Sequence, residues 1–168
     1  MSAPVTVLGL DPGSRVTGYG LIREEGGQPR LLKAGAIRTD SSAEWWVRLG
    51  QIFKGVEALI LEYEPLESAM EEVFVAVNTS SALKLGQARG AAVAACAAHG
   101  VPVIGYEPTK VKKNLVGVGR AEKSQVAFMV GRILGVKPDW SSDAADALGL
   151  ALCHLNMRRI KARIPLDG

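Results

Sequence analysis

The chain begins with an apolar run that ends at a charged residue and a turn. Residues 5–10 are mostly aliphatic or β-branched, which is typical of a buried strand. Asp11 follows this run, and Pro12 and Gly13 after it favour a tight turn. A carboxylate beside a buried strand is costly to desolvate unless something pairs with it. Asp11 is therefore either an acid that stabilises the turn or a ligand for a metal cation, and other carboxylates must decide between the two.

Two further segments carry carboxylates that can join Asp11. Asp143 and Asp146 are three positions apart in a predicted helix, so they share one helix face, and Glu71 lies in a predicted strand over 66–74. The helix dipole explains an acid at Asp143 but explains Asp146, which apolar residues flank, less well. Carboxylates are the ligands that Mg²⁺ prefers, and two such ions about 4 Å apart can promote phosphodiester hydrolysis. The spacing therefore favours a metal site.

The charge is distributed unevenly along the chain. The formal net charge is only +3, but residues 40–75 hold eight acidic and two basic residues, and residues 84–132 hold eight basic and two acidic ones. A basic half suits a polyanionic partner such as nucleic acid, and an acidic region suits divalent cations. Ordinary solvated surface would give the same counts, so charge alone does not decide.

The predicted elements form one α/β chain. Strands over 5–10, 16–23 and 30–38 are expected to be consecutive and antiparallel, with a loop of several residues over 24–29. The remaining elements are expected as a helix over 42–63, a strand over 66–74, a helix over 78–99, a strand over 101–106, a basic segment over 109–114, and helices over 121–134 and 143–159.

Two of these helices carry specific expectations. The apolar spacing of the first predicts that Trp45 and Trp46 pack in or at the boundary of the core. The helix over 78–99 is rich in Ala and Gly, so another element can approach it closely. That element is either the sheet of the same chain or a second copy of the helix.

Composition limits the class of protein. The 168 residues, 48% of them hydrophobic, fit a single domain over 1–168, with 160–168 as a loose tail. No apolar run is long enough for a membrane span and no signal peptide is evident, so we expect no membrane partner and a cytoplasmic location. Cys96 and Cys153 lie in apolar helices and are expected to be buried free thiols. No zinc pattern, P-loop or nucleophile elbow is present in the sequence.

Five separated blocks resemble, in order and spacing, the RuvC family of Holliday junction resolvases. They are LDPGSRVTGYG (10–20), EEVF (71–74), SALKLGQARG (81–90), AEKSQV (121–126) and DAADAL (143–148). The resemblance implies an RNase H-like fold, in which helices flank a five-stranded mixed sheet whose first three strands are antiparallel. It also implies a homodimer that cuts four-way DNA junctions with Mg²⁺ or Mn²⁺ in recombination and repair, with RuvA and RuvB as partners.

The resemblance also assigns roles by position. The four catalytic, metal-binding carboxylates are Asp11, Glu71, Asp143 and Asp146. Lys123 is expected to act in both catalysis and DNA binding, and Phe74 to pack against unpaired bases at the crossover. Lys112 matches a family residue tied to the same two roles as Lys123. Apart from these matched positions, the basic residues expected to contact DNA are Arg15, Lys84, Arg89, Lys113 and Arg120. A second acid, Glu72, follows Glu71, and the register of the family block selects Glu71 as the ligand.

The resulting hypothesis is a metal-dependent endonuclease that uses two metal ions in each active site. It would place paired symmetric nicks in junction strands of like polarity and leave 5′-phosphate and 3′-hydroxyl ends. Two rivals remain at this point. One is an RNase H-like nuclease that acts on RNA–DNA hybrids or other branched nucleic acids, and the other is a non-catalytic junction-binding protein.

Overall fold

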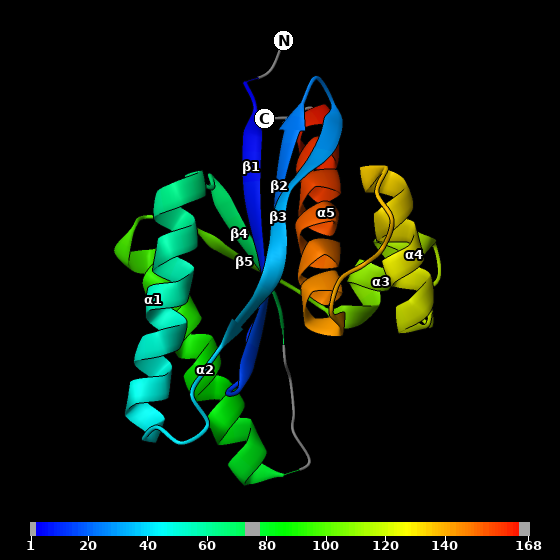
Figure 1. Cartoon of the computed structure of the whole chain (residues 1–168). Helices are drawn as coiled ribbons and strands as arrows, with labels where there is room; N and C mark the ends of the chain where they lie inside the picture. The colour runs from blue at the N-terminus through cyan, green and yellow to red at the C-terminus, as the bar shows by residue number, and fades with distance from the viewer. Residues whose placement is uncertain (1–2, 73–77, 165–168) are drawn as a thin grey trace.

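A computed structural model describes residues 3–72 and 78–164, which form one five-stranded sheet between two layers of helices (Figure 1). The strand order is β3-β2-β1-β4-β5. The strands are β1 (Val5–Asp11), β2 (Val16–Glu25), β3 (Gln28–Arg38), β4 (Glu67–Glu71) and β5 (Val103–Tyr106). The first three strands are antiparallel, and β1, β4 and β5 are parallel to one another. The predicted mixed sheet is confirmed.

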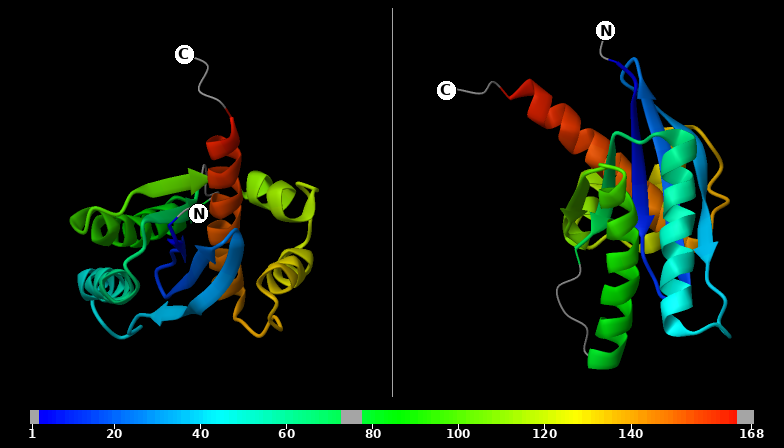
Figure 2. Two further views of the ribbon diagram at one scale, coloured as in Figure 1. Left: turned by 90° about the horizontal axis from the view of Figure 1, so that it is seen from above. Right: turned by 90° about the vertical axis from the view of Figure 1, so that its left-hand side faces the viewer.

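The helices divide between the two faces of the sheet (Figures 1 and 2). One face carries α1 (Trp45–Tyr63) and α2 (Thr79–Ala98). The other face carries α5 (Ser142–Arg163), with α3 (Pro108–Val116) and α4 (Lys123–Leu134) beside it. Because both faces are covered, β1 needs apolar side chains in both directions, which explains its mostly apolar sequence.

Glycines in β1 and β2 allow α5 to lie unusually close to the sheet. A Cβ atom on Gly9 would overlap the carbonyl oxygen of Ala147, and one on Gly18 would overlap the backbone of Asp143. Gly18 is also the register partner of Asp11 across the β1–β2 ladder. These glycines therefore bring the first turn of α5 next to the end of β1.

Several boundaries differ from the sequence expectations. The β2–β3 connection is a tight turn through Gly26 and Gly27, both with positive φ, in place of the expected loop over 24–29. The basic segment over 109–114 lies inside the helix α3, which Pro108 begins. Helix α5 continues to Arg163, so 160–163, which we expected in a loose tail, are helical.

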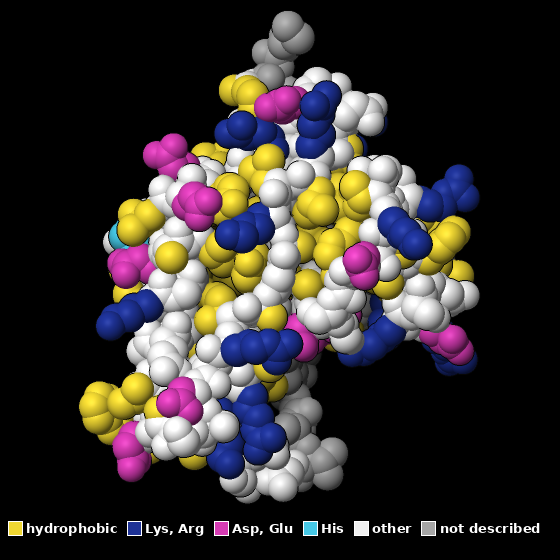
Figure 3. All heavy atoms as spheres, in the orientation of Figure 1, with side chains coloured by type: hydrophobic (Ala, Val, Ile, Leu, Met, Phe, Trp, Pro, Cys, Tyr) yellow, Lys and Arg dark blue, Asp and Glu magenta, His cyan; other side chains and the backbone are white. Residues whose placement is uncertain are grey.

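The prediction that Trp45 and Trp46 pack in the core or at its boundary is wrong. The two side chains are 60% and 64% exposed, whereas the later residues Ile52 and Val56 of the same helix are fully buried. The tryptophans occupy the first turn of α1, at the end of the helix that extends past β3 (Figure 1). Apolar side chains protrude at this end of the molecule (Figure 3).

Helix α2 packs with one face and leaves another open. Ala88 and Ala92 are fully buried beside α1, while a Cβ atom on Gly86 or Gly90 would meet nothing within 4 Å. Packing within the chain therefore accounts for one side of this helix.

Two expectations from composition have direct counterparts in the structure. Cys96 and Cys153 are buried and free, as predicted. Within the ranges 3–72 and 78–164, every helix is too short or too polar to cross a bilayer.

Candidate metal and nucleic-acid site

A cavity of about 330 Å³ opens where β1, β4 and α5 meet. Asp11 is the last residue of β1 and Glu71 the last residue of β4, and both side chains line the cavity. Asp143 and Asp146, from the first two turns of α5, line it from the other side. The structure therefore brings together all four carboxylates that the sequence singled out.

The turn after Asp11 is held in place by two other elements. Arg48 of α1 donates from Nη2 to the carbonyl oxygen of Ser14 at 2.6 Å, and the Thr39 hydroxyl donates to the same oxygen at 2.9 Å. Sequence reasoning missed both residues, because neither lies near Asp11 in the chain and neither forms part of a local motif.

The other carboxylates have local supports of their own. The Ser141 hydroxyl oxygen accepts from the backbone N–H of Ala144 at 3.3 Å, which caps α5 just before Asp143. At the end of β4, Arg89 of α2 donates from Nη1 to the carbonyl oxygen of Glu71. This arginine thus joins α2 to the strand end that presents a carboxylate.

The carboxylates repel one another in a partly buried setting. Burial, followed by the charges of Asp146, Glu71 and Asp143, raises the pKa of Asp11 from 3.8 to about 7. Burial and Asp146 also raise the pKa of Glu71, against the opposing effect of Lys123. The site is therefore short of positive charge, which is the electrostatic condition that favours binding of a cation.

Two lysines form the basic wall of the cavity. Lys123 Nζ lies 3.3 Å from Asp146 Oδ2, and the charge of Asp146 raises the pKa of this lysine. Lys112 also lines the cavity, and its charge opposes the rise in the pKa of Glu71. A phosphate that entered the cavity would meet both cations.

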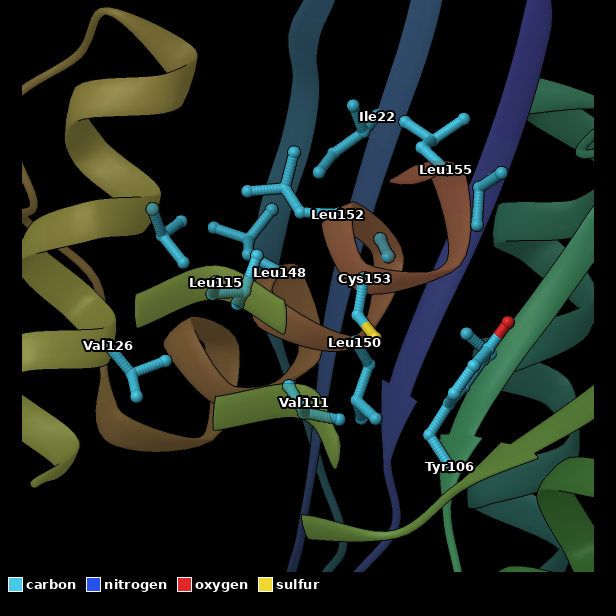
Figure 4. Packing of buried hydrophobic residues seen from close by; sticks show 14 of the residues in the cluster. Ile22, Tyr106, Val111, Leu115, Val126, Leu148, Leu150, Leu152, Cys153 and Leu155 are labelled. Carbon is cyan, nitrogen blue, oxygen red and sulfur yellow. The ribbon is translucent and has the colours of Figure 1, made fainter. Parts of the chain in front are cut away.

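The remaining walls are apolar, and half of their residues come from α3, which the sequence predicted only as a basic segment. Pro108, Val111, Val126 and Leu150 line the cavity, and Figure 4 shows three of them packed between α3, α4 and α5. Sequence reasoning missed this part of the site. The signal for α3 was the proline at its first position and the four-residue spacing of Val111 and Leu115.

The other predicted DNA-binding residues lie outside this cavity. Those with exposed side chains that do not line it are Arg15, Lys84, Lys113 and Arg120. Arg89 lines a smaller neighbouring cavity of about 80 Å³, which Asp11 and Glu71 share. Phe74 lies outside the described residues. Glu72 does not line the main cavity, in keeping with the choice of Glu71.

The carboxylates have the chemistry to bind a divalent cation, although their side chains are not yet close enough together to coordinate one ion jointly. Among the described residues, no three His, Cys, Asp or Glu side chains form a group that could hold a metal ion. Four carboxylates nevertheless share one cavity, and carboxylate oxygens are the ligands of hard ions such as Mg²⁺. Their mutual repulsion is what a divalent cation would relieve.

Comparison with known proteins identifies relatives along nearly the whole chain. The family model described as crossover junction endodeoxyribonuclease RuvC matches residues 7–154. A protein of that name from Oleidesulfovibrio alaskensis is 58% identical over 157 residues, covering 94% of each chain. Another from Nitratidesulfovibrio vulgaris (strain DP4) is 54% identical over 160 residues, covering 95% of this chain and 96% of its own.

Solved structures agree with the sequence matches. Thermus thermophilus RuvC in complex with a Holliday junction substrate is similar with a TM-score of 0.89 and 36% identity, covering 94% of this chain and 96% of that one. The yeast mitochondrial Holliday junction resolvase Ydc2, with a TM-score of 0.68 and 12% identity, shares the fold, covering 92% of this chain and 81% of its own.

Proposed function

The chain belongs to the RuvC family of crossover junction endodeoxyribonucleases, and on this premise we propose how its own residues carry out the reaction. The proposed substrate is a four-way DNA junction, cut by paired symmetric nicks in strands of like polarity during recombination and repair. The observation that carries the proposal is the single cavity that four carboxylates and two lysines line.

Asp11, Glu71, Asp143 and Asp146 are the proposed metal ligands. Nucleases of this family depend on divalent metal, and we assign Mg²⁺, with Mn²⁺ as a substitute and two ions per site. When bound, these ions would polarise a phosphate oxygen and lower the pKa of a water molecule.

The basic wall is proposed to hold the scissile phosphate. Lys112 and Lys123 would neutralise its non-bridging oxygens, and the ion pair with Asp146 keeps the Lys123 ammonium at the edge of the cavity. In-line attack by water opposite the 3′ oxygen leaves a 5′-phosphate and a 3′-hydroxyl.

The DNA outside the cavity would contact the exposed basic residues. Phosphate contact is proposed for Arg15, Lys84, Lys113 and Arg120, and for Arg89 at the smaller cavity. Phe74 is proposed to stack on an unpaired base at the crossover, an interaction worth about 1–3 kcal/mol.

The symmetry of the substrate supports a homodimer. A four-way junction has approximate two-fold symmetry, and a closed dimer would supply two matching sites. The open face of α2 at Gly86 and Gly90 is the proposed interface. RuvA and RuvB are the proposed partners, and two buried free thiols support a cytoplasmic location.

A substrate panel tests the proposal against its rivals. The protein is incubated with a synthetic four-way junction, an RNA–DNA hybrid and linear duplex DNA, each with Mg²⁺, with Mn²⁺ or with EDTA. We expect metal-dependent paired nicks in the junction alone. Preferential cutting of the hybrid would favour the other nuclease, and junction binding without cutting in any metal would favour a non-catalytic protein.

A further inference from the structure

A chain of polar side chains crosses the apolar core between β4, β5 and α5. His154 is only 5% exposed and lies in the part of the core that α5 forms with the sheet. Its Nδ1 is 2.7 Å from the Tyr106 hydroxyl oxygen, and its Nε2 is 2.5 Å from Glu67 Oε2. Arg158 Nε lies 3.4 Å from the same carboxylate oxygen. We call Tyr106, His154 and Glu67 the brace.

The hydrogen bonds of the brace are mutually consistent. When His154 Nε2 donates to the Glu67 carboxylate, the other ring nitrogen, Nδ1, serves as an acceptor. The Tyr106 hydroxyl then donates to Nδ1, and burial raises the pKa of Tyr106 to about 12, so that it keeps this proton. Both ring nitrogens are thus satisfied, which a buried imidazole requires.

Each member of the brace lies on an element that carries or adjoins a candidate metal ligand. Glu67 and Glu71 are the first and last residues of β4. His154 is two turns beyond Asp146 on α5, about 12 Å along the axis at 1.5 Å per residue. Tyr106 is the register partner of Glu71, and its carbonyl oxygen accepts from the Glu72 N–H at 2.8 Å.

The two sides of α5 are attached differently. Toward β1 and β2 the helix rests on close backbone contact at Gly9 and Gly18. Toward β4 and β5 its attachment includes the brace, whose hydrogen bonds are directional. Apolar contact tolerates small sliding and rotation, whereas directional bonds between two elements fix their register.

We propose that Tyr106, His154 and Glu67 are positioning residues for the metal site. Their hydrogen bonds set the register of α5 against β4, and hence the separation of Asp146 from Glu71. None of the three lines the cavity. The inference rests on the proposed metal site and adds that its geometry is set from within the core.

The test compares two deletions of a single buried hydroxyl. Tyr106→Phe removes a bond of the brace and keeps the ring. Ser68→Ala, the control, removes the hydrogen bond from Ser68 Oγ to the Pro102 carbonyl oxygen at 2.9 Å. Ser68 lies on β4, as Glu67 does, but its side chain is on the face of the sheet opposite α5. Both variants are expected to lower the melting temperature by a similar few degrees, about 2–6 °C.

Direct Mn²⁺ binding, measured by electron paramagnetic resonance of free Mn²⁺, separates positioning from stability. We expect Tyr106→Phe to weaken binding about threefold to tenfold, below the roughly 10–100-fold typical of groups that bond metal ligands directly. Ser68→Ala should bind as the unaltered protein does. Junction cutting by Tyr106→Phe should recover at saturating Mn²⁺. Glu67→Gln, which keeps an acceptor oxygen, should weaken Mn²⁺ binding less than Glu67→Ala does.

The outcomes distinguish failure of the positioning role from failure of the proposed metal site. Unchanged Mn²⁺ affinity in Tyr106→Phe, with a melting temperature lowered as in Ser68→Ala, would overturn the positioning role. Unchanged Mn²⁺ affinity in Asp146→Asn would overturn the proposed metal site itself.

Discussion

The interface between β4 and α5 has two ends that differ in charge balance: carboxylates are uncompensated at one end and compensated at the other. At one end Glu71 and Asp146 face a shared cavity and repel each other. At the other end Glu67 lies 3.4 Å from the guanidinium of Arg158, which compensates its charge, and 2.5 Å from His154 Nε2. The same strand and helix therefore carry one unbalanced pair of acids and one acid that is paired with an arginine.

This difference separates the parts of the interface that stabilise the fold from the part available for chemistry. Separating a partly buried charge from its partner is costly, so such a pair resists displacement of the elements that hold it. A group of like charges destabilises the protein alone and becomes favourable only when a cation binds. The carboxylates are thus expected to reduce stability in the absence of metal, and the brace to compensate nearby.

The largest expected contrast between the two ends is in catalysis. Asp11→Asn should lower junction cutting roughly 10³-fold, because a bound metal contributes several kcal/mol to transition-state stabilisation. Glu67→Gln should lower cutting less than about tenfold. Single-turnover cleavage at fixed Mg²⁺ measures both, and a gel-shift assay in Ca²⁺ should show junction binding preserved. Native-rate cutting by Asp11→Asn would contradict the assignment.

The second contrast is in stability without metal. The pKa of Asp11 is about 7 in the folded protein, against an ordinary value of 3.8 for an aspartate in the unfolded chain. Between these values the folded state retains a proton that the unfolded state has lost, so stability falls as the pH rises from 4 to 7. Asp11→Asn should therefore stabilise the metal-free protein at pH 8 by about 1–3 kcal/mol, and Glu67→Gln should destabilise it by about 1–3 kcal/mol.

Urea denaturation in EDTA at pH 5 and pH 8 measures the free energy of unfolding of both variants, and hence whether each substitution stabilises or destabilises the protein. At pH 5 the advantage of Asp11→Asn should be smaller, because Asp11 in the folded protein is then already protonated. Equal destabilisation by the two variants at pH 8 would remove the distinction between the two ends of the interface.

The smallest expected effect concerns the basic wall. Lys112→Ala should reduce the magnitude of the slope of log affinity against log salt concentration by about 1, the amount expected for the loss of one phosphate contact. The control Lys54→Ala removes an exposed lysine on α1, away from the cavity, and should leave the slope unchanged. Titrations of a labelled junction at several salt concentrations provide the slopes, and equal slopes for both variants would exclude a phosphate contact at Lys112.

The sheet and the carboxylate set were predictable because their signals are local. A mostly apolar strand that ends in Asp11, and two acids three positions apart in a helix, can be recognised from a few neighbouring residues. Gly18 in the segment after Asp11 proved to be a site of close approach by α5, which the sequence alone does not reveal.

The features that sequence reasoning missed depend on contacts between distant segments. The bonds of the brace join residues 48 and 87 positions apart, so no local pattern indicates them. The exposure of Trp45 and Trp46 depends on where α1 begins relative to the sheet, although their spacing suits a buried face. Helix α3 has nine residues, too few for a strong periodic signal.

The central claim is that the four carboxylates hold the catalytic metal, and its most direct test is a crystal of the protein grown with Mn²⁺. An anomalous difference map locates the ion without reference to activity. The account predicts a peak in the cavity, within ligand distance of Asp11, Glu71 and at least one of Asp143 and Asp146. A cavity without a peak at saturating Mn²⁺, or a peak only at other carboxylates, would contradict it.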